Sequence, residues 1–150
     1  MYKINFSPID PGLYAEDPEL LQMYEMANGR EGFINPTRRE YLLGKLATLE
    51  THAAYTSDIH EAAGIIVSEK RPAEDKLWVD CLAVQPHHRN QRLGSQLLQF
   101  AGHYALSNNL SHIELCVVNN TNEFYLKNGF KEANDVRWSG LSKIYRKKVI

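Results

Sequence analysis

The sequence predicts an α/β fold in which a mixed, mostly antiparallel sheet carries helices on both faces. Near the start, Tyr2, Ile4 and Phe6 alternate with polar residues, which is the period of a half-buried strand. The run Leu77–Val84 is nearly continuous in apolar residues, as expected of a buried central strand. Elsewhere, apolar residues recur at the three- and four-residue spacing that is typical of amphipathic helices.

The first half of the chain indicates two helices and two strands after the opening strand. Asp17-Pro18 predicts a helix start, with Asp at the N-cap and Pro at the first helical position, and Gly29 predicts its end. Thr37-Arg38-Arg39-Glu40 matches a capping box. A leucine stripe follows it, at Leu42, Leu43, Leu46 and Leu49. Residues 53–57 and 62–67 are expected to form strands joined by a turn.

The second half predicts a helix from Leu93, whose core face would be Leu97, Phe100, Ala101 and Tyr104. A strand at 113–118 and a short helix at 121–128, ended by Gly129, follow it. Strands at 130–133 and 144–149 close the chain, and the basic residues of the last strand are expected to protect a sheet edge. The resulting order is β–α–α–β–β–β–α–β–α–β–β. Because no repeat or linker divides it, residues 1–150 are expected to form one domain.

Composition excludes several classes of protein. The chain has 150 residues, of which 43% are hydrophobic and 23% charged, and its net charge of −1 argues against nucleic acid as a partner. No apolar run approaches the roughly 20 residues that a membrane helix needs, and no signal-peptide pattern is present. Cys81 and Cys116 both lie in apolar, strand-like runs, so we expect buried free thiols and a cytoplasmic protein.

The segment from Val84 to Ser95 carries the strongest functional signal. It reads Val-Gln-Pro-His-His-Arg-Asn-Gln-Arg-Leu-Gly-Ser, and it joins the central strand to a helix through a basic turn. Such a turn directs backbone N–H groups and the positive end of the helix dipole toward one point, where phosphate binds. Arg89 and Arg92 would add full charges, although they could instead be solvated surface residues. His87-His88 lacks metal-ligand geometry and is expected to be a solvated turn.

Residues from about Ala63 to Glu132 resemble the GNAT N-acetyltransferase superfamily. The family's phosphate-loop motif, Gln/Arg-x-x-Gly-x-Gly/Ala, corresponds to Arg89-Asn90-Gln91-Arg92-Leu93-Gly94, and its aromatic–Tyr pair before Gly-Phe corresponds to Phe124-Tyr125 before Gly129-Phe130. About 31 residues separate Gly94 from Tyr125, which leaves room for one helix and one strand. Arg92 departs from the motif, since it replaces the first glycine. A positive φ there would strain a non-glycine residue, whereas a helical φ would avoid strain.

The resemblance implies an acetyl-CoA-dependent N-acetyltransferase that transfers an acetyl group to a primary amine by direct attack. Acetyl-CoA would be the acyl donor, and no metal is implied. The strand end and the loop would contact the cofactor, through Leu82, Ala83, Val84, Arg89, Asn90, Gln91, Arg92, Leu93, Gly94 and Ser95. Asn119 or Asn120 would contact the pantetheine arm.

Two residues are the candidate catalytic groups. The resemblance implies that the hydroxyl of Tyr125 protonates the leaving thiolate, a role suited to a donor of pKa ~10; taken alone, Tyr125 could be a core-edge aromatic. Asp80 is the candidate general base, because it lies on the same strand face as Leu82 and Val84. A structural role for Asp80 is the alternative, and Glu114 or water could act as the base instead.

No motif in this sequence identifies the amine acceptor. It is expected to be a small-molecule amine or a protein amine, recognised by Pro18–Leu49 and the final strands, with neither nucleic acid nor a membrane as partner. A homodimer is left open. The alternative function is an acyl-CoA-binding or regulatory module that has the same fold and no turnover.

Overall fold

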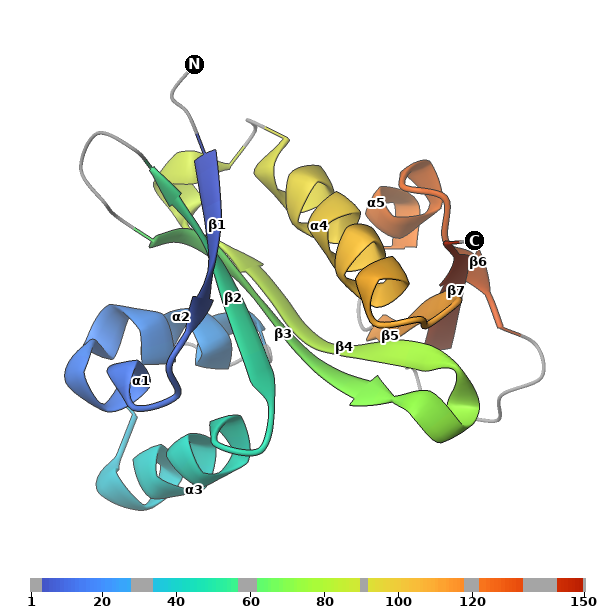
Figure 1. Ribbon diagram of the computed structural model, residues 1–150. Helices are drawn as coiled ribbons and strands as arrows, with labels where there is room; N and C mark the ends of the chain where they lie inside the picture. The colour runs from blue at the N-terminus through green and yellow to red at the C-terminus, as the bar shows by residue number, and fades with distance from the viewer. Residues whose placement is uncertain are drawn as a thin grey trace. The chain divides into compact units, whose positions relative to one another are not determined.

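The computed structural model describes residues 4–27, 34–56, 62–89, 92–117, 122–133 and 143–149. Figure 1 shows the elements in chain order, which are β1 (Ile4–Ile9), α1 (Leu13–Glu16), α2 (Pro18–Ala27), α3 (Pro36–Leu46), β2 (Glu50–Thr56), β3 (Ala62–Arg71), η1 (Pro72–Glu74), β4 (Lys76–Val84), η2 (Pro86–His88), α4 (Leu93–Ser107), β5 (His112–Val117), α5 (Asn122–Lys127), β6 (Lys131–Glu132) and β7 (Lys143–Lys148). None of the helices within these ranges has the length and apolar character needed to cross a membrane.

The sheet has seven strands in the order β1-β2-β3-β4-β5-β7-β6. Strands β1 and β2, β2 and β3, β5 and β7, and β6 and β7 pair antiparallel, whereas β4 and β5 pair parallel. A parallel pair needs a crossover connection, and α4 lies in that connection. The predicted mixed, mostly antiparallel sheet is therefore confirmed.

The last strand, β7, is not an edge strand, so the predicted role of its basic residues in protecting a sheet edge is wrong. It pairs with β5 from Lys143 to Lys148, and β6 pairs with its other side at Tyr145 and Arg146. Chain order could not reveal this, because the final strand inserts between β5 and β6. The side chain of Arg146 instead binds a buried carboxylate, described below.

The chain forms two compact units. The first comprises Met1–Ser68 with Cys81–Leu97, and the second comprises Glu69–Asp80 with Leu98–Ile150. Strands β3 and β4 and helix α4 contribute residues to both units.

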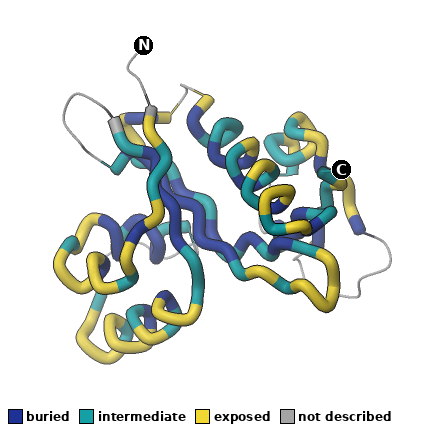
Figure 2. Tube along the Cα trace, viewed as in Figure 1, coloured by how far each residue is buried: buried dark blue, intermediate teal, exposed yellow. Residues whose placement is uncertain are grey.

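In the first unit, helices cover both faces of the sheet, as predicted. Side chains from α1, α2 and α3 share a core cluster with strand residues, which include Ala53, Ile65, Val67 and Cys81. On the opposite face of β3, Gly64 lies against Leu93 and Leu97 at the start of α4. Figure 2 shows that the strands of this unit are buried along much of their length.

The helix starts in the first unit are set by local capping. Asp17 caps α2, because its Oδ1 accepts a hydrogen bond of 3.0 Å from the N–H of Glu19, as predicted. Helix α3 starts at Pro36, and the side chain of Asn35 accepts from the Arg38 N–H at 2.8 Å. The capping box predicted at Thr37 is therefore wrong: Asn35 followed by proline already satisfies the first turn. The single-turn helix α1 was not predicted, since four residues show no period.

Strand β4 is not buried on both faces, contrary to the prediction. Its burial alternates along Lys76–Val84, with Leu77, Val79, Cys81 and Ala83 buried. The side chains between them are only half-buried. One face of β4 is thus more open than a continuous apolar run suggested. Cys81 and Cys116 are both free thiols, as predicted, but Cys116 is only half-buried.

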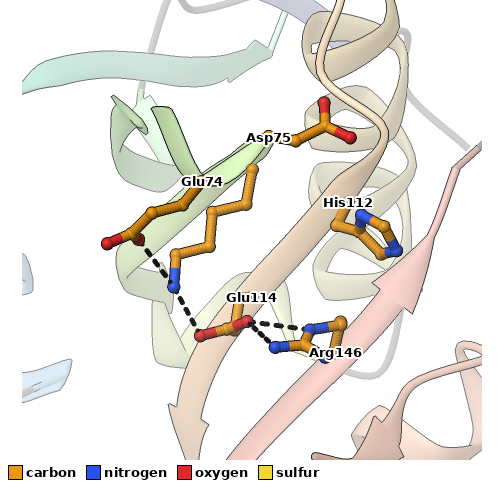
Figure 3. Close-up of a pocket in the computed structure, with 6 residues that line it drawn as sticks. Glu74, Asp75, His112, Glu114 and Arg146 are labelled. Carbon is orange, nitrogen blue, oxygen red and sulfur yellow. Dashed lines mark hydrogen bonds and ion pairs between the residues drawn. The ribbon is translucent and has the colours of Figure 1, made fainter. Parts of the chain in front are cut away.

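The second unit is held by a buried carboxylate that joins three strands. Glu114 on β5 is 1% exposed; one of its oxygens lies 2.8 Å from Lys76 Nζ on β4, and the other lies 2.8 Å from Arg146 Nη2 on β7. These three residues, with Glu74, Asp75 and His112, line a cavity of about 360 Å³. Figure 3 shows Glu114 bonded to Arg146 there. Because a buried charge is costly unless it is paired, Glu114 requires both cations.

Gly64 is required by the contact between β3 and the start of α4, and substituting it should destabilise the fold. A Cβ there would lie 2.9 Å from Leu97 Cδ1 and 3.0 Å from the Ala83 carbonyl oxygen. We expect Gly64→Ala to lower the free energy of unfolding by about 1–3 kcal/mol, measured by urea denaturation. The matched control is Gly44→Ala in exposed α3, where a Cβ meets nothing within 4 Å; it should add roughly 0.5–1 kcal/mol. Equal stabilisation by both substitutions would contradict this role for Gly64.

Candidate active site

The predicted succession of strand, basic turn and helix is present in the first unit. Strand β4 ends at Val84, and the next residue, Gln85, is held by a 2.8 Å hydrogen bond from its N–H to the carbonyl of Ala63 on β3. The 3-10 turn η2 follows, and the Arg89 Nε lies 3.4 Å from the Val84 carbonyl oxygen. Asn90 and Gln91 lie outside the described residues. The turn is thus anchored to the strand on both sides of Pro86.

Arg92 adopts the left-handed conformation, with φ +60°. The position therefore does require the conformation that favours glycine, and the helical alternative that would avoid strain does not occur. Left-handed backbone costs a non-glycine residue about 1–2 kcal/mol. The Arg92 carbonyl accepts the 3.0 Å hydrogen bond from Gln96 N–H that starts α4. The N–H groups of Leu93, Gly94 and Ser95 accordingly form the first turn of the helix, where no intrahelical acceptor exists.

The turn has two exposed arginines and one buried histidine. Arg89 and Arg92 are exposed. His88, however, is 5% exposed, so the expectation that His87-His88 is a solvated turn is wrong for His88. The N–H of His88 donates to the Gln85 carbonyl at 2.9 Å. The buried ring of His88 nevertheless stays in contact with the ring of exposed His87, with 4.2 Å between the ring centroids.

The end of β4 leaves part of its backbone outside the sheet ladder. In the described chain, β4 pairs with β5 only where Lys76–Val79 meets His112–Leu115. On that side, the backbone groups of the later β4 residues are therefore not used by β5. Ala83 is buried, whereas Leu82 and Val84 are half-buried. Unused N–H groups at a strand end are suitable donors to a carbonyl oxygen.

The two candidate catalytic residues belong to the second unit, whereas Arg89–Ser95 belongs to the first. Asp80 is half-buried, so it does not carry the full desolvation that its apolar neighbours in the sequence suggested. The half-buried ring of Tyr125 on α5 makes edge-to-face contacts with Phe124 and Phe130, at 5.0 and 5.9 Å between centroids. Asn119 and Asn120 lie outside the described residues.

Glu114, the alternative general base, is poorly placed for that role. Its two carboxylate oxygens are bonded to Lys76 and Arg146, and it is 1% exposed. A general base needs an open lone pair within reach of the proton it accepts. The arrangement therefore argues against Glu114 as the general base.

One set of residues had no motif in the sequence. A second cavity of about 130 Å³ lies in the first unit, and it is lined by Asp17, Glu19, Leu20, Met23, Tyr55, Ala62 and Gln85. The only sequence signal here is Asp17-Pro18, which predicts a helix start. Residues of α2, β2 and β3 and the residue after β4 come together here, so spacing along the chain could not reveal the cavity.

Comparisons with known proteins agree with this architecture. The acetyltransferase (GNAT) domain family matches residues 47–132, whereas no curated protein matches the sequence. A GNAT-family acetyltransferase from Staphylococcus aureus Mu50 is similar in structure, with a TM-score of 0.74 and 16% identity over 99% of this chain and 100% of that one.

Two similar structures contain a bound cofactor. PaiA N-acetyltransferase from Thermoplasma acidophilum, in complex with coenzyme A, has a TM-score of 0.72 and 17% identity over 97% of this chain and 99% of its own. A GNAT-family acetyltransferase from Elizabethkingia anophelis with acetyl-CoA bound has a TM-score of 0.71 and 18% identity over 97% of both chains. At such low identities these likenesses establish a common fold.

The family match extends over more than half of the chain. It runs from just before β2 to the end of β6, and it includes both the Arg89–Gly94 loop and the Phe124–Phe130 motif. Together with the sheet order and the strand–turn–helix junction, this match shows that the chain belongs to the GNAT acetyltransferase domain family.

Proposed function

We propose that the protein is an N-acetyltransferase that transfers the acetyl group of acetyl-CoA to a primary amine. The observation that carries this proposal is the left-handed turn at Arg92, which starts α4 directly after a basic turn. A strained backbone at a helix start is retained where the resulting geometry is needed. Here it exposes first-turn amides beside two arginines, within the part of the chain that matches the family.

The loop would bind the pyrophosphate of the cofactor. The amides of Leu93, Gly94 and Ser95 would donate to phosphate oxygens, and the helix dipole would add to their attraction. The exposed side chains of Arg92 and Arg89 would add charge-assisted hydrogen bonds to the phosphates. Further along the cofactor, the backbone N–H groups at the end of β4 would donate to the acetyl carbonyl oxygen and stabilise negative charge that develops on it.

The chemical step is direct attack. The neutral amine nitrogen would form a bond to the acetyl carbon, the carbon–sulfur bond would break, and the thiolate would take the proton of the Tyr125 hydroxyl. The nitrogen would lose one proton to solvent as the amide forms, and the Tyr125 phenolate would regain a proton from solvent. The products are the N-acetylated amine and CoA with a free thiol. An alkylamine of pKa ~10.4 is mostly protonated at pH 7, so Asp80 would accept the amine's proton directly or through water. The acceptor would be a small-molecule amine or an amine on a protein.

Substitution of Arg92 should separate its charge from its backbone conformation. Arg92→Ala and Arg92→Gly both remove the guanidinium, so both should weaken acetyl-CoA binding about three- to tenfold in calorimetry at moderate salt. Arg92→Gly should be the more stable of the two by roughly 1 kcal/mol, because glycine adopts positive φ without strain. Lys148→Ala, an exposed charge on β7, is the control. Absence of binding by the unsubstituted protein at millimolar acetyl-CoA would overturn the proposed function.

Substitution of Asp80 tests the general base. Asp80→Asn should lower the rate of acetyl transfer roughly 100-fold at pH 7, because the amine loses its proton acceptor. Much of the loss should be recovered at high pH, where more of the amine is already neutral. The measurement is the pH profile of thiol release at saturating acetyl-CoA. An unchanged rate at pH 7 would assign proton removal to bulk water, since Glu114 is bonded on both oxygens.

Substitution of Tyr125 separates the enzyme from a binding module. Tyr125→Phe keeps the ring contacts with Phe124 and Phe130, so stability and acetyl-CoA affinity should be preserved. Turnover should fall, although modestly, because a CoA thiolate (thiol pKa ~8.5 by analogy with Cys) is already a tolerable leaving group. Single-turnover kinetics would measure the chemical step. Equal rates would make Tyr125 a packing residue. Tight cofactor binding without transfer to any amine would instead favour an acyl-CoA-binding module.

A further inference from the structure

The 130 Å³ cavity of the first unit is too small for a whole ligand and suits the end of one. Pockets that take an entire small molecule have volumes of roughly 300–1,000 Å³. The cavity lies among the start of α2, strand β2 and the residue that follows β4; Figure 1 shows these elements. Its lining divides into an acidic wall, an apolar wall and one amide.

The acidic wall consists of half-buried Asp17 and exposed Glu19. The cap accounts for one oxygen of Asp17, which accepts the Glu19 N–H at 3.0 Å. The side-chain carboxylate of Glu19 has no part in this helix cap. In the ranges that the structure describes, neither carboxylate forms an ion pair with a lysine or arginine. The wall therefore presents negative charge that a bound cation would neutralise.

The apolar residues of the lining suit the carbon chain of such a cation. Leu20 and Met23 are 1% and 2% exposed, and the half-buried ring of Tyr55 lies beside them in the lining. Burial raises the pKa of the Tyr55 phenol, and the Asp17 carboxylate raises it further. The charge of Asp17 thus acts on the Tyr55 phenol, which lines the same cavity. An aromatic ring beside carboxylates attracts organic cations through its π face.

Gln85 connects this cavity to the end of β4. It directly follows Val84, and its own N–H is fixed to the Ala63 carbonyl at 2.8 Å. Gln85 also lines the cavity. A ligand held there would therefore lie next to the strand end that is proposed to bind the acetyl carbonyl.

We propose that this cavity is the acceptor subsite and that it holds the non-reacting ammonium group of a diamine. The inference rests on the proposed acetyl transfer and specifies its acceptor. Carboxylates stabilise an ammonium ion and so oppose the loss of its proton. This would hinder an amine that must lose its proton to attack the thioester, but it would not hinder a second amine that stays charged. A diamine has one amine for each role. One nitrogen stays charged between Asp17 and Glu19, and the other loses its proton and attacks the acetyl carbon.

Calorimetry with 1,4-diaminobutane tests the subsite without turnover. Asp17→Asn keeps a good helix cap, Glu19→Gln keeps the side-chain length, and Glu16→Gln, exposed on α1, is the matched control. In the CoA-loaded protein, the double variant should bind 1,4-diaminobutane about three- to tenfold more weakly than the unsubstituted protein and the control. The difference should shrink at high salt. Equal affinity in the double variant, or no binding to the unsubstituted protein, would overturn the inference.

Thiol release in the same proteins separates this inference from the proposed function. The unsubstituted protein should prefer 1,4-diaminobutane to n-butylamine in kcat/KM, and the double variant should lose that preference while its KM for acetyl-CoA stays unchanged. Transfer with an unaltered preference in the double variant overturns the diamine subsite and leaves the acetyltransferase. No transfer to any amine, despite acetyl-CoA binding, overturns the proposed function and the acceptor role with it.

Discussion

The junction between β4 and α4 is the constraint on which the candidate site depends. The chain leaves a central strand, makes one 3-10 turn and starts a 15-residue helix within the span from Gln85 to Leu93. The left-handed backbone at Arg92 makes the last change of direction possible. Arginine tolerates this conformation at a cost of about 1–2 kcal/mol, and the guanidinium that it adds lies at the helix end where an anion is favoured.

Packing on both sides fixes the junction. Gln85 is bonded to β3, His88 is buried, and Gly64 leaves room for the Leu97 side chain of α4, which a Cβ would meet at 2.9 Å. The helix start is therefore positioned by contacts within one unit. A rigid support of this kind lets amides act as preorganised donors, because little reorganisation accompanies binding.

Charge is distributed unevenly over a nearly neutral chain. Basic residues surround the start of α4, acidic residues lie at the start of α2, and the second unit buries Glu114 between two cations. The buried carboxylate is fully used in joining β4, β5 and β7, and structural pairing is its clearest role. Asp17 uses one oxygen to cap α2, but in the described ranges neither it nor Glu19 pairs with a lysine or arginine, which is why these carboxylates support a ligand.

Local sequence determined much of this protein. Period-two and helical patterns predicted the strands and the long helices, Asp17-Pro18 predicted the start of α2, and two short motifs predicted the family and the strand–turn–helix junction, because each depends on neighbours within a few residues. Only the tertiary structure decided the conformation of Arg92, the open face of β4, the internal position of β7, the burial of His88 and the cations on Glu114. It also assembled the acidic cavity, whose lining comes from segments far apart in the chain. Such features depend on contacts between elements that are far apart in the chain, and the spacing of residues along a single sequence does not indicate those contacts.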